Sequence, residues 1–196
     1  MLLSIIGDMA IETPQYEVLD KNGRIEFRRY RSYITANVEI KADSYSSAAN
    51  KAFRTLADYI FGNNTKQTKI AMTAPVISQK SISSETIAMT TPVAAAKLNN
   101  ETYVIAFSMP SSYSLEDLPL PNNKEVSIKK ISSHEAVVIR FSGYTTEAKI
   151  EKMTNELKKW AKQKQLILAG EPTVLRYDPP WKPGFIRRNE VSIDIK

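Results

Sequence analysis

Hydrophobic and polar positions alternate along much of this chain, and a period of two predicts β-strands. In the N-terminal half the alternating stretches are residues 16–19, 24–30 and 33–40, with a turn at 20–23. Further along, strands are predicted at residues 101–107, 125–131, 136–141, 172–177 and 189–195. Strands of this kind, separated by turn residues, favour antiparallel sheet.

Two other stretches carry apolar side chains at helical spacing. The first follows Asp43 and Ser44, which suit an N-cap, and ends near Gly62 after about 16 residues. Its apolar stripe is broader than one sheet contact requires, so a second apolar contact is expected. The second helix follows Gly143 and Thr145 and has a narrow stripe, enough for one sheet face: Ile150, Met153, Leu157, Trp160 and Ala161.

The predicted elements therefore run strands, helix, strands, and then repeat that order. Two such halves predict an α+β fold: a distorted antiparallel β-barrel of two pseudo-symmetric β-β-α-β-β repeats flanked by two α-helices. The strict alternation of strand and helix that marks a parallel sheet is missing from the pattern. We divide the chain into an N-terminal extension, residues 1–13, and a single domain, residues 14–196.

One octapeptide occurs twice. Residues 69–76 read Lys-Ile-Ala-Met-Thr-Ala-Pro-Val and residues 86–93 read Thr-Ile-Ala-Met-Thr-Thr-Pro-Val, so six of the eight positions are identical. Proline has no amide hydrogen and favours extended backbone before it, so each copy is expected to end a strand or lie at a sheet edge. Two interpretations stay open: the copies line an apolar surface, or they only pack the core.

Composition narrows the possible chemistry. The 196 residues include no cysteine and one histidine, His134, which excludes disulfides and iron–sulfur clusters and argues against a zinc site. His134 is expected in an exposed hairpin turn. Nucleotide-binding glycine motifs and the hydrolase nucleophile motif are missing from the sequence, and no nucleophile–base pair is visible. We therefore expect no catalytic residues, no metal site and no enzymatic activity.

The net charge is +6 and the isoelectric point about 9.4, but Lys and Arg are spread along the chain. A nucleic-acid partner is not expected, because the charge forms no block and no helix-turn-helix pattern is present. No apolar run reaches the roughly 20 residues of a membrane span, and residues 1–8 lack the basic start of a signal peptide. We expect a cytoplasmic monomer without a transmembrane segment.

Several features instead suit a binding function. The broad first helix, the Met-containing octapeptides and a rigid loop at residues 178–184 with Trp181 and Lys182 together offer apolar walls with cations at the rim. Such a surface fits a flat, apolar ligand that carries carboxylates, since Arg or Lys pairs with the acids.

The same segments carry a family resemblance. The octapeptide at 69–76, the ending at 177–183 with Arg187-Arg188-Asn189-Glu190-Val191, the opening Tyr16-Glu17-Val18 with Arg28-Arg29-Tyr30, and the helix end at 59–63 resemble the SOUL/haem-binding protein family. The likeness covers roughly residues 14 to 195 in the same order. It implies a distorted barrel with two helices and a pseudo-twofold repeat, and a non-enzymatic carrier, buffer or sensor that binds haem or another tetrapyrrole reversibly and non-covalently.

Carried onto this chain, the resemblance implies a shallow apolar groove beside the first helix. The residues implied as ligand contacts are Asn50, Phe53, Arg54, Ala57, Met72 and, for a propionate, Lys182. The resemblance also implies an axial histidine in the early strands of some members. Residues 33–41 contain none here, so burial is expected to drive binding. Met72 and Met89 could either ligate the iron or pack in the core.

The alternative functions are a small-molecule-sensing or protein-interaction module that does not bind haem, and an enzyme acting on a haem precursor or hydrophobic ester.

Overall fold

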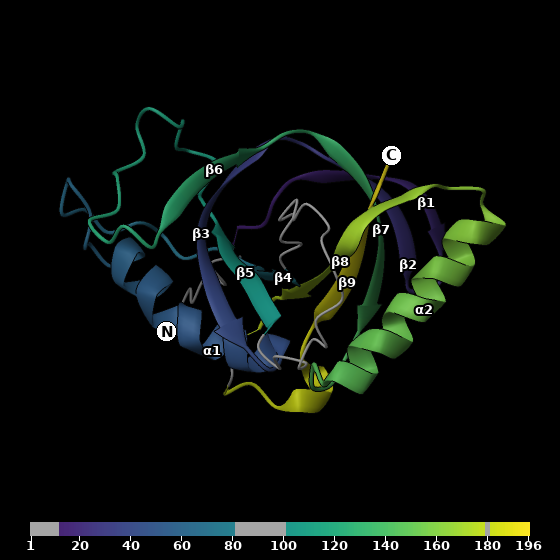
Figure 1. The fold of residues 1–196 in the computed structure, drawn as a ribbon. Helices are drawn as coiled ribbons and strands as arrows, with labels where there is room; N and C mark the ends of the chain where they lie inside the picture. Colours follow the sequence, from purple (N-terminus) through teal and green to yellow (C-terminus); the bar gives the residue numbers. More distant parts are fainter. Residues whose placement is uncertain (1–11, 81–100, 179–180) are drawn as a thin grey trace, which may run out of the picture.

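The computed structural model describes residues 12–80, 101–178 and 181–196. Figure 1 shows a strongly curved sheet with both helices on its outer side. The elements are β1 (Tyr16–Asn22), β2 (Ile25–Tyr30), β3 (Tyr33–Ala42), α1 (Tyr45–Ile60), β4 (Val76–Lys80), β5 (Glu101–Ser108), β6 (Ser127–Ile131), β7 (His134–Phe141), α2 (Glu147–Gln163), β8 (Leu168–Arg176), the 3-10 helix η1 (Gly184–Ile186) and β9 (Asn189–Ile195). The predicted α+β class, with one large antiparallel sheet and two helices, is confirmed.

The strand order is β1-β2-β7-β9-β8-β4-β5-β3-β6, and every neighbouring pair is antiparallel. Among the described strands β1 and β6 are the two edges, so the sheet they form is open and does not close into the expected barrel. From β2 to β6 the pairing has matching halves. The β3–β5 and β4–β5 pairs correspond to β7–β9 and β8–β9, with β4–β8 at the centre.

Helix α1 begins and ends where local chemistry places it. The Ser47 backbone N–H donates to Ser44 Oγ at 3.1 Å, which satisfies one of the free amide groups of the first turn. At the other end Gly62 takes a φ of +122°, a conformation that side chains with a Cβ rarely adopt. Between these ends the buried side of α1 packs against β3, β4 and β5.

Helix α2 covers the other half of the outer face. Its N-cap is Thr146, and its buried residues include the predicted stripe of Ile150, Met153, Leu157, Trp160 and Ala161. This stripe packs against β7, β8 and β9. The narrow stripe therefore does what its width predicted: it contacts one sheet face and leaves the lysine-rich side to solvent.

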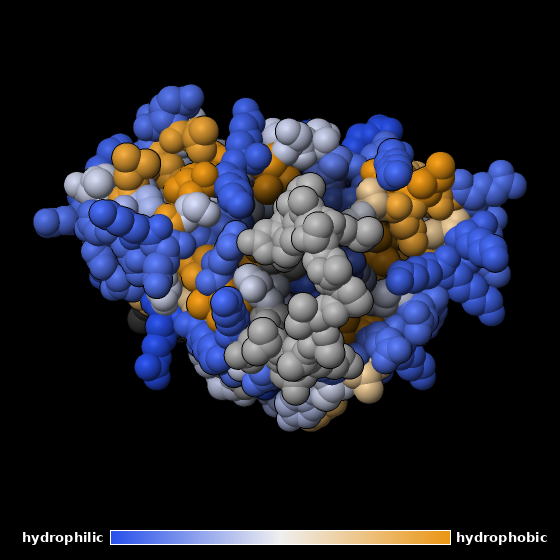
Figure 2. Space-filling model, viewed as in Figure 1, coloured by the Kyte–Doolittle hydropathy of each residue, from blue (hydrophilic) through white to orange (hydrophobic). Residues whose placement is uncertain are grey.

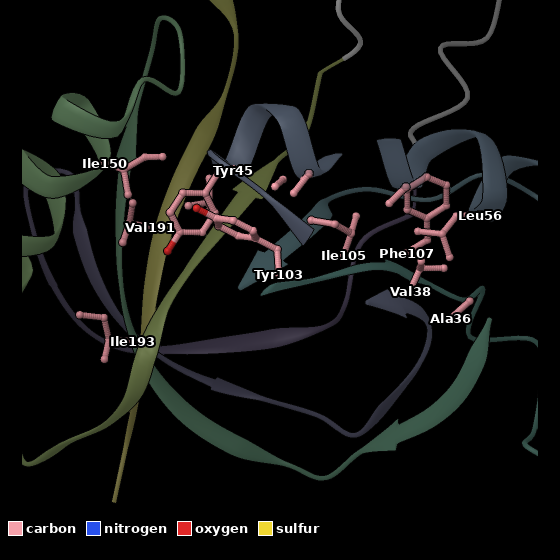
Figure 3. Packing of buried hydrophobic residues seen from close by; sticks show 14 of the residues in the cluster. Ala36, Val38, Tyr45, Leu56, Tyr103, Ile105, Phe107, Ile150, Val191 and Ile193 are labelled. Carbon is pink, nitrogen blue, oxygen red and sulfur yellow. The ribbon is translucent and has the colours of Figure 1, made fainter. Parts of the chain in front are cut away.

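The main hydrophobic core lies between the outer face of the sheet and the two helices. Figure 3 shows it continuing from Ile150 and Val191 near α2, through Tyr45 and Tyr103, to residues under α1. The rings of Tyr45 and Tyr103 meet edge to face with centroids 4.9 Å apart, so they join the two halves. Burial of one such large side chain contributes on the order of 1.5–3 kcal/mol.

The first octapeptide copy departs from the prediction. Residues 69–75 form no strand, and β4 begins only at Val76, after a cis Ala74–Pro75 bond. Proline therefore precedes a strand, and that strand lies inside the sheet between β8 and β5 rather than at an edge or a strand end. The reason is that residues 69–75 return the chain from the end of α1 to the sheet. The second copy, 86–93, lies outside the described residues.

The described residues contain no helix that is both long and apolar enough to cross a membrane.

Candidate ligand-binding surface on helix α1

Four of the predicted contact residues share the outer side of α1. Asn50, Phe53, Arg54 and Ala57 are spaced by three, four and seven positions, which places them on one helix face. Asn50 and Arg54 are exposed, whereas Ala57 is buried. The structure thus brings these four together, with the small Ala57 as the floor between larger neighbours.

Phe53 lies at the boundary between core and solvent. One edge of its ring meets Phe107 of β5 at a centroid distance of 5.7 Å and an interplanar angle of 63°. Even so, 40% of Phe53 is exposed, although Phe107 below it is buried. An aromatic ring that is held from one side and open on the other is a ready platform for a flat apolar ligand.

Two further apolar side chains are exposed near this face. Phe61, at the C-cap of α1 and two turns after Phe53, is 59% exposed, and Met72 is 45% exposed. The Met72 segment is anchored at both ends. Ile70 N–H donates to Ile60 O at 2.7 Å, and the Thr73 hydroxyl contacts the backbone oxygen and hydroxyl of Ser108 in β5. Figure 2 shows apolar patches breaking the hydrophilic surface on this side.

Phe61 is absent from the contacts that the sequence predicts. The signal for it was available, because Phe61 follows Phe53 and Ala57 at steps of four residues, and such a row continues along one side of a helix. Its exposure follows from its place at the C-cap, beyond the last turn that the sheet covers. We therefore add Phe61 to the candidate surface, which from here on comprises Asn50, Phe53, Arg54, Ala57, Phe61 and Met72.

The cations at this surface differ in their pairing. Arg54 is exposed and makes no hydrogen bond or ion pair within the described parts of the chain. Lys182 has its Nζ 2.5 Å from Asp178 Oδ1 and keeps 35% of its side chain exposed. Burial raises the pKa of Asp178, but the hydrogen bonds from Lys182 and from the Arg188 backbone N–H outweigh it and hold that pKa below its ordinary value. Lys182 is therefore already satisfied by a carboxylate.

The loop that holds Lys182 begins beside the first turn of α1. Arg176, the last residue of β8, lies with Nη1 3.4 Å from Tyr45 O and Nη2 3.5 Å from Ser46 Oγ. Further along the loop Trp181 is 83% exposed. Lys182 donates from Nζ to Asp178, and its backbone oxygen accepts from the Nε of Arg187, both within the loop. The loop thus begins next to the N-terminus of α1.

His134 is placed differently from the prediction. It is the first residue of β7 rather than part of an exposed turn, and its ring stacks on Tyr30 at a centroid distance of 5.2 Å. The reason is that β7 begins two residues earlier than its apolar pattern suggests, because β2 pairs with it as far as Tyr30 and His134. In the described parts of the chain no group of three or more His, Cys, Asp or Glu residues could hold a metal ion.

Comparison with known proteins identifies the family. The family model described as SOUL heme-binding protein matches residues 11–194, so this chain belongs to the SOUL family. The resemblance read from the motifs is thereby confirmed. Xenopus tropicalis heme-binding protein 1 is 25% identical over 177 residues, covering 88% of this chain and 84% of that protein. Human heme-binding protein 2 is 27% identical over 144 residues, covering 71% of this chain and 64% of that protein.

Among solved structures, the EcmrR C-terminal domain has a TM-score of 0.63 at 11% identity, covering 92% of this chain and 98% of that one. At this identity the likeness shows a shared fold and carries no information on the ligand.

Proposed function

We propose that this protein is a non-enzymatic tetrapyrrole-binding protein that holds haem or a related macrocycle in a shallow groove on the outer face of α1. Its role would be that of a carrier, buffer or sensor. Membership of the SOUL family and two relatives named as heme-binding proteins support a tetrapyrrole ligand. The observation that carries the choice of surface is Phe53, which rests on Phe107 yet leaves 40% of its area open.

The chemistry of the surface matches the ligand class. A tetrapyrrole is flat and apolar with acidic side groups, so it needs rings or thioethers against its face and cations at its edge. Phe53, Phe61 and Met72 offer apolar contact with the face. Arg54, which makes no ion pair with any described residue, offers the cation at the edge. Ala57 lets the macrocycle approach the helix closely, and Asn50 adds an amide at the rim. Lys182 is a second cation, but a carboxylate from the ligand would compete with Asp178 for it.

Burial, rather than iron coordination, is the expected source of affinity. The only histidine of the chain, His134, lies on β7 with its ring against Tyr30, which lines the inner side of the curved sheet, away from α1. Phe53, Phe61 and Met72 are 40%, 59% and 45% exposed, so a macrocycle that covers them removes apolar area from water. Haem iron, when the ligand carries it, would supply redox and ligand-binding chemistry. The residues of the candidate surface would have little effect on the properties of the iron.

The test is a titration of the full chain with haemin and, in parallel, iron-free protoporphyrin IX, followed by the Soret band. Both are expected to bind with similar affinity, and Phe53→Glu is expected to weaken both by about tenfold or more, because it places a charge under the ring. Ile167→Glu is the matched control: Ile167 is 65% exposed in the connection after α2, and both affinities should stay unchanged. Absence of binding at micromolar concentrations, or equal affinities for wild type and Phe53→Glu, would overturn the proposal.

A further inference from the structure

The inner face of the curved sheet carries a set of side chains that the outer-face core does not include. Strand register defines this face: Tyr30 pairs with His134, Ala136 with Asp194, and Val138 with Ser192. Tyr30, Ala136 and Val138 form a small cluster of their own with Tyr16, separate from the main core. Both helices lie on the other side of the sheet (Figure 1).

This inner face encloses a cavity of about 330 Å³. Residues from eight of the nine strands line it, which places it inside the curve of the sheet. Small side chains such as Ala106 and Ser192 stand where larger apolar ones fill the interior of a small closed barrel. The volume is at the lower end of the range for small-molecule pockets.

The cavity is separate from the α1 surface. Ala106 and Phe107 are neighbours in β5, and successive side chains of a strand point to opposite faces. Ala106 lines the cavity, whereas Phe107 supports Phe53 on the outer side. One strand thus divides two candidate sites, and a change on one side can be made without touching the other.

Aromatic rings form one wall of the cavity. The ring of His134 stacks on Tyr30 with an interplanar angle of 15°, and Tyr33 approaches it at a centroid distance of 6.2 Å. Tyr177 lines the same space. Such a set of rings offers faces and edges to a flat aromatic ligand.

The described lining of the cavity carries a negative charge, although the whole chain has 27 Lys and Arg against 21 Asp and Glu. The nearby Arg28 is buried behind Tyr30 and is paired with Glu190. Among the described lining residues there is no Lys or Arg, and Asp194 supplies the one carboxylate. Its nearest basic group in this lining is His134, whose Nε2 is 3.8 Å from Asp194 Oδ1. The other ring nitrogen, Nδ1, lies 3.0 Å from Ser132 O and must donate there, so a neutral imidazole turns only a lone pair to the carboxylate.

A comparison with Glu190 on the neighbouring part of β9 makes the difference clear. Glu190 is fully buried, and its carboxylate is met by Arg28, Arg188 and the Tyr177 hydroxyl. Asp194 has no comparable set of donors within the described residues, and 56% of its side chain is exposed at the cavity mouth. Burial raises the pKa of Asp194, which agrees with a carboxylate whose charge is incompletely compensated.

We propose that the inner cavity is a second ligand site, for a small planar aromatic cation whose ring lies against Tyr33 and His134 and whose charge faces Asp194. A ring that carries a positive charge gains both from the aromatic faces and from the carboxylate. An anionic ligand of the same size meets Asp194, and the described lining offers it no Lys or Arg. The inner cavity and the α1 surface therefore select ligands of opposite charge.

Three probes of similar size and different charge test this on the full chain: N-methylquinolinium (cation), quinoline (neutral) and 2-naphthoate (anion). Isothermal titration calorimetry at pH 7.5 should show the affinity order cation, neutral, anion. Asp194→Asn should weaken the cation about tenfold and leave quinoline unchanged, since the substitution removes only the charge. Ala106→Leu should weaken both by filling the space, and thermal unfolding of that variant checks that it is folded.

The position of the bound cation is determined by NMR. His134 is the only histidine in the chain, so its imidazole signals report on this cavity alone and should shift when N-methylquinolinium is added. Phe53→Glu should leave these shifts unchanged, and Asp194→Asn should leave haemin binding unchanged, so the two proposals fail separately. The proposal is overturned if the cation does not bind at millimolar concentration, if 2-naphthoate binds as well as the cation, or if Asp194→Asn leaves the cation's affinity as it was.

Discussion

Arg28 and Glu190 form a buried ion pair across the inner face of the sheet, with Arg28 Nη1 2.8 Å from Glu190 Oε2 and 3% and 0% of their side chains exposed. They belong to β2 and β9 and are 162 positions apart in the sequence. The Arg28 guanidinium also donates to the Tyr30 hydroxyl at 3.0 Å, and the Tyr177 hydroxyl donates to Glu190 at 2.7 Å. The pair therefore links strand β2 of the first hairpin to the last strand, β9, by spanning β7, which lies between them.

Removal of one partner should be costly, because it leaves a buried charge short of its counter-charge. We expect Arg28→Met to lower the free energy of unfolding by about 3 kcal/mol, measured by urea denaturation at pH 7. The neighbouring Arg29→Met is the matched control: Arg29 pairs with Glu135 at 2.8 Å but is 53% exposed, so its loss should cost less than about 1 kcal/mol. Equal effects of the two substitutions would show that burial of the pair does not determine its contribution.

The same pair predicts how stability depends on pH. Burial raises the pKa of Glu190, but the hydrogen bond from Arg28 and the charges of Arg28 and Arg188 outweigh it, so the pKa in the folded protein lies below its ordinary value of 4.5. A lowered carboxyl pKa contributes stability that is complete above pH 4.5 and is lost as pH falls through the folded-state value.

Urea midpoints of wild type and Glu190→Gln at pH 7, 5, 4 and 3 measure this contribution. The difference in unfolding free energy between the two proteins should be constant from pH 7 to 5 and should shrink below about pH 4.5, because Gln does not titrate. A difference that stays the same down to pH 3 would contradict the assignment of this acid dependence to Glu190.

Local chemistry predicted much of the fold. Ser44 and Gly62 bound α1 because caps act within one helical turn, and the stripe around Met153 and Leu157 is buried as its spacing requires. The pairing of strands that lie far apart in the sequence could not be predicted from local patterns. The Arg28–Glu190 link depends on β7 lying between β2 and β9, and nothing near either residue in the sequence specifies that order.

The candidate site likewise combines residues that could be named from the sequence with features that depend on contacts between distant segments. Phe53 and Arg54 were named from the family resemblance, and their adjacent positions on α1 leave both exposed. The pairing of Lys182 with Asp178 and the position of His134 on the inner face depend on how loops and strands meet in space. The cavity depends on which side of the sheet the helices cover. Ala106 lines the cavity because it points to the side that the helices leave uncovered.

The thioether of Met72 distinguishes apolar contact from iron ligation. Leucine has a similar volume and apolarity but no sulfur, so Met72→Leu should leave the affinities for haemin and protoporphyrin IX unchanged. Met72→Glu should weaken both, because Met72 is 45% exposed on the candidate surface and the substitution adds a charge there. Soret titrations of both variants are the measurement. If Met72→Leu weakens haemin and not protoporphyrin IX, sulfur ligation of the iron contributes to binding.

The two cations proposed for the ligand's carboxylates should contribute unequally. Arg54 is free of hydrogen bonds and ion pairs within the described residues, whereas the Lys182 ammonium lies 2.5 Å from Asp178. A carboxylate gains a new partner at Arg54 but must share Lys182 with an existing one. Arg54→Gln is therefore expected to weaken haemin binding about threefold, and Lys182→Gln to weaken it less.

Haemin dimethyl ester provides the control for this comparison, because it keeps the macrocycle and lacks the two charges. Its affinity should be the same for wild type, Arg54→Gln and Lys182→Gln, and the effect of Arg54→Gln on haemin should decline as salt rises, since exposed charges are screened. If Arg54→Gln weakens the ester as much as haemin, Arg54 acts through its apolar stem rather than its charge. If Lys182→Gln has the larger effect on haemin, the carboxylates lie at the loop after β8, and the ligand sits nearer the N-terminus of α1 than Phe53 alone indicates.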